Sequence, residues 1–162
     1  MIIGFPDGYT TEQKNNFISR FDFFSGIGSE SNSGSADATV VLLKEGYSCA
    51  QVEAGLEYLK QFPEVRYATP VFGAGESDKG ITNQFIVNLK ASASRTDLET
   101  IAKKTNTTIV DQLSDVTFIL SADKTSQGNA LEMANYFNQS SRVDSSEPDF
   151  LFLFSSSYVI ND

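Results

Sequence analysis

The sequence predicts an α+β protein made of two tandem β-α-β-β-α-β units, each an antiparallel sheet with its helices on one face. The first observation is an internal repeat: residues 37–72 align without a gap on residues 115–150, at an offset of 78, with nine identical pairs among 36. Both copies have β-type runs at their ends and a helical stretch between them, which favours duplication of one supersecondary unit. The length of 162 residues accommodates two small units.

The second unit begins with a strand and a covering helix. Residues 83–90 (NQFIVNLK) alternate apolar side chains toward one face, as a strand does. Residues 94–105 begin with Ser94 and with Asp97 three positions later, which is a capping pattern, and they continue with an apolar stripe at helical spacing. A helix is therefore expected to cover the strand.

The remaining elements of the second unit follow in order. Two β runs, residues 107–112 and 116–122, are separated by a short polar break that predicts a hairpin. Residues 127–140 carry apolar side chains at helical spacing and predict a second helix. The last strand, residues 143–154, contains Pro148 and ends in five consecutive apolar residues. A strand with one wet face would alternate, so another surface is expected to cover some of them.

The first unit repeats this order with a truncated first strand. Its strands are expected at residues 2–5, from 23 onward, 38–44 and 65–72, and its helices at 11–21 and 48–62. A Gly/Ser-rich run at residues 25–36 predicts a long, loose hairpin, and a flexible loop is favoured over a phosphate site because no phosphate-binding glycine motif is present. Both units thus follow the ferredoxin-like arrangement. The predicted domains are residues 1–74, a linker at 75–81, residues 82–154, and a tail at 155–162.

Composition excludes several functions. A net charge of −9 disfavours nucleic acid, which requires a basic surface; it indicates either a solvated acidic surface or a partner with a basic or helix-N-terminal docking surface. The absence of histidine removes Ser-His-Asp and Cys-His catalysis and most zinc sites. Cys49 has no disulfide partner and no base, so a structural role is favoured. No run reaches the ~20 apolar residues of a membrane helix. We expect a non-catalytic chain without cofactor or metal.

Laid out in this way, the second unit and its tail resemble the propeptides of bacterial subtilisin-like serine proteases. The resemblance rests on the element order over residues 83–154 and on three local features. These are NQFIVNLK before a helix, GNALEMANYF followed by VDSSEPDFLF, and the final Asn161-Asp162. The resemblance implies a secreted or cell-surface precursor in which this prodomain helps its protease, in cis, to fold and then inhibits it.

The resemblance also implies roles for individual residues. In such propeptides an acidic-x-acidic pair on the last strand caps two helix N-termini of the protease, and here Glu147 and Asp149 occupy those positions. Thr69 and Val71 stand at the equivalent places of the first unit, so only the second unit is expected to dock. The tail that follows would lie in the substrate cleft, and its residues here are Leu151, Phe152, Leu153, Phe154 and Tyr158.

Two alternatives stay open. Glu147 and Asp149 also fit two exposed strand carboxylates beside a proline, with no partner. The chain as a whole also fits a non-catalytic protein- or ligand-binding module formed by an acidic pseudo-dimer. In either case the first unit is expected to brace the second by burying apolar surface against it.

Overall fold

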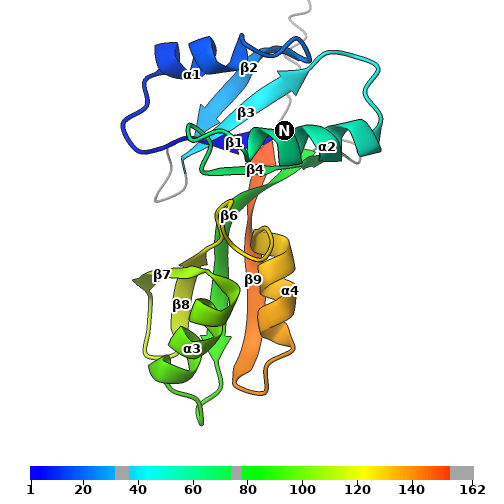
Figure 1. The fold of residues 1–162 in the computed structure, drawn as a ribbon. Helices are drawn as coiled ribbons and strands as arrows, with labels where there is room; N and C mark the ends of the chain where they lie inside the picture. Colours follow the sequence, from blue (N-terminus) through cyan, green and yellow to red (C-terminus); the bar gives the residue numbers. More distant parts are fainter. Residues whose placement is uncertain (32–36, 74–77, 154–162) are drawn as a thin grey trace, which may run out of the picture.

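The computed structural model describes residues 1–31, 37–73 and 78–153 (Figure 1). Within these ranges the chain forms two antiparallel sheets and four helices, so the predicted α+β class is confirmed. The predicted tail at 155–162, together with Phe154, lies outside the described residues, and so does Tyr158 within it.

The first sheet has the strand order β2-β3-β1-β4, with every neighbouring pair antiparallel. Its strands are β1 (Ile2–Gly4), β2 (Phe24–Ser31), β3 (Ala38–Leu43) and β4 (Tyr67–Thr69). Helices α1 (Thr11–Ile18) and α2 (Cys49–Leu59) enclose a core on one face, in which Phe17 and Leu59 pack with Ile3 and Phe5.

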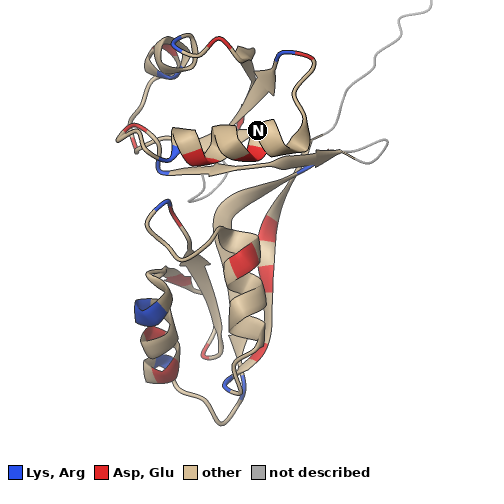
Figure 2. Ribbon diagram, turned by 45° about the vertical axis from the view of Figure 1, so that its right-hand side comes forward, with Lys and Arg blue, Asp and Glu red and all other residues tan. Residues whose placement is uncertain are grey.

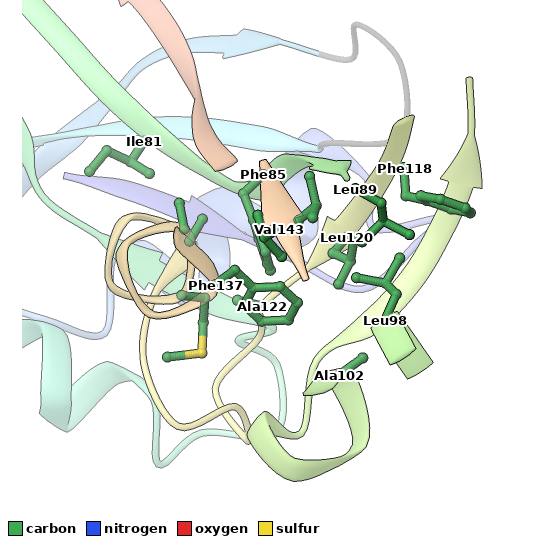
Figure 3. Packing of buried hydrophobic residues seen from close by; sticks show 14 residues of the cluster. Ile81, Phe85, Leu89, Leu98, Ala102, Phe118, Leu120, Ala122, Phe137 and Val143 are labelled. Atoms are coloured by element: carbon green, nitrogen blue, oxygen red, sulfur yellow. The ribbon is translucent and has the colours of Figure 1, made fainter. Parts of the chain in front are cut away.

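The second sheet is built around one long strand, β6. Its strands are β5 (Val71–Gly73), β6 (Asp78–Leu89), β7 (Thr108–Gln112), β8 (Thr117–Ser121) and β9 (Val143–Leu153). On one edge, β6 pairs with β9 along both of its halves. On the other edge, the start of β6 pairs with β5 and the rest with β8, and β8 in turn pairs with β7. Helices α3 (Arg95–Thr105) and α4 (Ala130–Asn138) cover one face, and Phe85, Leu120 and Phe137 lie in the core between (Figure 3).

Each of the four described helices begins at a complete capping box. A side-chain oxygen at the N-cap accepts the backbone N–H three residues later, and the side chain at that position accepts the N-cap N–H. The pairs are Thr10 with Gln13, Ser48 with Gln51, Ser94 with Asp97, and Asn129 with Glu132. The capping pattern that the sequence suggested at Ser94 is therefore confirmed.

The uncovered face of the first sheet packs against the ends of β6 and β9, which run from the second sheet to the first (Figure 1). We call this contact the joint; its apolar residues are Ile2, Ala38, Val40, Tyr67, Val71, Leu151 and Leu153. Gly80 makes the close approach possible, because a Cβ there would collide with the Cδ1 atom of Ile2. The expectation that the apolar end of the last strand needs a covering surface is thus confirmed for Leu151 and Leu153.

Two predicted boundaries are corrected by pairing between distant segments. The strand expected at 65–72 is divided at Pro70, which has no N–H to donate: β4 belongs to the first sheet and β5 to the second. Residues 78–81 of the predicted linker are the start of β6, paired with β5 and β9, whereas residues 75–77 lie outside the described ranges.

The Gly/Ser-rich run is also corrected. Instead of a loop from residue 25, β2 extends to Ser31 and pairs with β3. Two register shifts interrupt this pairing, and Gly26, with φ of 149°, lies at the first. An edge strand tolerates such bulges and small residues because only one of its sides is paired. Residues 32–36 lie outside the described part of the chain.

The repeat is not gapless in three dimensions. Thr69 and Glu147 are equivalent in register at an offset of 78, but Val40 and Ile119 match at 79. The helix N-caps Ser48 and Asn129 match at 81. The offset grows because the segment before α4 is longer than the segment before α2. It falls again because α4 is two residues shorter than α2, so the offset at the last strand is close to its starting value.

Candidate functional site

Two equivalent cross-strand rows occupy the faces of the sheets that the helices leave uncovered. The first row is Val40, Ile2 and Thr69, on β3, β1 and β4. The second row is Ile119, Ile86 and Glu147, on β8, β6 and β9. No side chain of the first row is more than 8% exposed, whereas the two isoleucines of the second row are half-buried and Glu147 is exposed. The second row is therefore the accessible one.

Hydrogen bonds hold the strands beside the second row. The Asn88 amide donates to Ser145 Oγ at 3.0 Å, and Asn88 Oδ1 accepts from Thr117 Oγ1 at 2.8 Å. These three residues form the neighbouring cross-strand row. The half-buried isoleucines thus lie next to polar groups that are already paired with one another. The row has a carboxylate at each end, because Asp111 on β7 pairs with Ile119 as Glu147 on β9 pairs with Ile86. Asp111 Oδ1 accepts the Gln112 backbone N–H at 2.7 Å.

Glu147 is free of internal partners. It makes no ion pair and no side-chain hydrogen bond within the described ranges, and the residue after it, Pro148, offers no N–H. Acidic positions recur along β9, which also carries Asp144 and Asp149 (red, Figure 2). The side chain is therefore available for a donor on another molecule, such as the N–H groups at a helix N-terminus.

Asp149 differs from Glu147 although it lies only two residues away. It is half-buried, and its Oδ2 accepts a hydrogen bond from Thr82 Oγ1 at 3.0 Å. Thr82 belongs to β6 and is itself buried. The structure thus places both acids of the predicted pair on β9 but gives only one of them an internal partner.

The predicted cleft-binding residues on β9 have neighbours inside the chain. Leu151 and Leu153 pack in the joint. Phe152 is exposed, with Lys79 Nζ 5.5 Å from its ring centroid. Their role in a substrate cleft stays a prediction, and in this structure the two leucines are in contact with the first sheet.

Ile86 and Ile119 were not among the residues singled out from the sequence. A signal for them exists: each is the middle of three consecutive apolar residues, in FIV at 85–87 and FIL at 118–120. A strand that is apolar on successive positions has two faces to cover, whereas a strand with one solvated face alternates. The helices cover only the first and third residue of each triplet, so Ile86 and Ile119 lie on the opposite face of the sheet.

Other features offer little for chemistry. No group of three or more His, Cys, Asp or Glu side chains that could hold a metal ion occurs within residues 1–31, 37–73 and 78–153. A hollow of about 300 Å³ lies between α2, β4 and the segment before α4. Its lysines are engaged: Lys60 pairs with Glu57 at 2.6 Å, and Lys124 donates to the Phe62 carbonyl at 2.6 Å.

None of the described helices has the length and apolar character needed to cross a membrane. Comparison of the chain with protein-family models, with curated proteins and with solved structures finds no match.

Proposed function

We propose that this chain is the N-terminal prodomain of a subtilisin-like serine protease, a non-catalytic module that assists the folding of the catalytic domain and then inhibits it. We further propose that both units are ferredoxin-like. In support, each has the element order β-α-β-β-α-β, with the first and third strands adjacent, the last strand beside the first, and both helices on one face.

One observation carries the proposal: equivalent rows on the two sheets are used differently. The first row is buried, whereas the isoleucines of the second are half-buried and Glu147 is exposed, with no side-chain partner among the described residues. A half-buried pair of isoleucines next to a free carboxylate suits a protein surface that presents apolar side chains beside a helix N-terminus. A prodomain that docks through its last strand would present such a surface.

The tail would act after docking. Leu151 and Leu153 lie at the end of β9, directly after the acidic pair, so a protease bound to the second row would have this segment next to it. To fill a substrate cleft as an added strand, the leucines would have to leave the joint. We assign the cleft-filling role to this segment in the protease-bound state.

The test is inhibition of purified subtilisin-type proteases by the chain, followed with a chromogenic peptide substrate, with chymotrypsin as an unrelated serine protease. Wild type is expected to inhibit a subtilisin-type enzyme and to raise its refolding yield. Glu147→Gln should weaken inhibition about tenfold, because a charge-assisted hydrogen bond contributes ~1.5–3 kcal/mol. Asp144→Asn removes the same charge from the same strand three residues away and should have little effect.

Absence of both inhibition and refolding assistance with every subtilisin-type protease would contradict the proposal. Equal effects of Glu147→Gln and Asp144→Asn would instead remove the docking role of Glu147. The exposed second row also suits the alternative of a free-standing protein-binding module. Tight binding to a protein that is not a protease, lost in Glu147→Gln, would favour that alternative.

A further inference from the structure

The two acids on β9 differ in surroundings because of an irregularity in β6. Ile81 pairs with Phe150 and Phe85 pairs with Pro148, so residues 82–84 of β6 lie opposite Asp149 alone. A strand with extra residues bends and turns its side chains in new directions. All three of these residues, Thr82, Asn83 and Gln84, are polar and buried.

The Thr82 hydroxyl is used in both directions. It accepts the backbone N–H of Gln84 at 3.1 Å, so its own hydrogen is left for another acceptor. That acceptor is Asp149 Oδ2, at 3.0 Å. A hydrogen bond to a charged carboxylate is stronger than one between neutral groups. The bulge of β6 and the carboxylate on β9 are therefore tied together.

The same region is attached on either side. The side-chain amide of Asn83 donates to Ser121 Oγ at 2.7 Å, and the backbone carbonyl of Asn83 accepts the Ala122 N–H at 2.7 Å. Both bonds attach the bulge to β8 and the residue after it. The Ile81 carbonyl accepts from Thr69 Oγ1 at 2.6 Å, which ties β6 to the first sheet. Asp149 thus lies where the β6–β9 pair passes from the second sheet to the joint.

Electrostatics agree with this position. Burial raises the pKa of Tyr67, a residue of the joint, the Asp37 carboxylate raises it further, and Arg66 lowers it, while Asp149 adds the smallest upward effect. Asp149 therefore lies near enough to the first sheet for a small electrostatic effect on Tyr67.

We propose that Asp149 is a positioning residue that Thr82 holds next to the joint, and that Glu147 alone of the acidic pair contacts a protein partner. The statement about Glu147 rests on the proposed function; the statement about Thr82 and Asp149 does not. Asp149 then affects docking indirectly, by keeping the second row in one orientation relative to the first sheet.

Hydrogen–deuterium exchange of the whole chain, together with protease inhibition, tests whether Asp149 positions the strands and Glu147 contacts the partner. Thr82→Val removes the hydroxyl at constant shape, and Asp149→Asn removes the charge while keeping an acceptor. Each should speed exchange in residues 78–82 and 149–153 about tenfold, and the double variant should add little to either. Thr82→Ser, which keeps the hydroxyl, should leave exchange unchanged. Glu147→Gln should weaken inhibition at wild-type exchange rates.

Unchanged exchange in both Thr82→Val and Asp149→Asn would overturn the positioning role. Loss of inhibition in Asp149→Asn at wild-type exchange rates would overturn the division of roles, because Asp149 would then contact the partner directly. If wild type inhibits no subtilisin-type protease, the proposed function fails, while the exchange measurements still decide whether Thr82 and Asp149 secure the joint.

Discussion

In the first sheet, the row of Val40, Ile2 and Thr69 faces away from the helices and is buried under the start of β6 and the end of β9. The equivalent row of the second sheet is accessible to solvent. The strand orders match, but the residues at the ends of the two rows differ. At the β4 position Thr69 can be buried, because its hydroxyl bonds to the Ile81 carbonyl. A carboxylate buried there would have to give up its hydration and would cost far more. One sheet thus uses its second face internally, and the other leaves it accessible.

Exchanging the residues at the β4 and β9 ends of the two rows should give the largest difference in stability between the sheets. Thr69→Glu buries a carboxylate in the joint and should lower the free energy of unfolding by about 3–5 kcal/mol. The reciprocal Glu147→Thr changes an exposed site and should stay within about 0.5 kcal/mol of wild type. Urea unfolding of both variants measures the difference. Similar losses in both would mean that the two rows are not used differently.

The contact between Ile2 and Gly80 gives the next largest effect. Gly80→Ala places a methyl group where the Ile2 side chain lies, and overpacking of this kind costs about 1–3 kcal/mol. Thermal or urea unfolding measures the loss. Adding Ile2→Ala should recover part of it, so the double variant should be more stable than the sum of the single effects predicts. Strict additivity would show that the two residues do not meet in solution.

The smallest expected effect is a difference in pH dependence between the helix caps of the two units. At the third helical position α1 and α2 carry Gln13 and Gln51, whereas α3 carries Asp97. Hydrogen bonds from the Ser94 backbone and hydroxyl, together with the charge of nearby Arg142, hold the pKa of Asp97 below its ordinary 3.8. A lowered folded-state pKa gives stabilisation that is complete above the ordinary value and is lost as the pH falls through the folded value.

Acid should therefore loosen the start of α3 before the starts of α1 and α2. An NMR titration of the Ser94 amide, which donates to Asp97 at 2.8 Å, reports this locally. A local probe is needed because the Arg20 side chain, by hydrogen bonding to Glu64, also lowers the pKa of that carboxyl. Asp97→Asn should abolish the transition at Ser94. A titration of Ser94 that persists in this variant would contradict the assignment.

Features with a short-range cause were predictable. The order of strands and helices follows from apolar periodicity, and the start of α3 from the Ser94 and Asp97 spacing. The early start of β6 was missed, because residues 78–80 have loop-type composition and become a strand only by pairing with β5 and β9. The extension of β2 to Ser31 was missed for the same reason, since pairing with β3 overrides the local signal of its glycines.

The candidate site was predictable in part. The sequence placed Glu147 on the last strand, and the structure has it there as an exposed residue, while its docking role stays a prediction. The hydrogen bond of Asp149 could not, because Thr82 lies 67 residues away and reaches it only through the bulge in β6. Ile86 and Ile119 carried a local signal of two-faced strands, but which of their faces would stay open depended on the helices.

The sequence by itself determined the α+β class, the succession of elements, the cap of α3 and the lack of histidine chemistry, since these depend on composition and on neighbours within a few residues. Only the tertiary structure decided that Leu151 and Leu153 cover the first sheet, that Asp149 is held by Thr82, and that the second row is left open. The physical reason is that burial and hydrogen bonding between distant segments depend on which faces meet. A chain with two similar sheets carries similar local patterns for both, and the contact between the sheets makes them different.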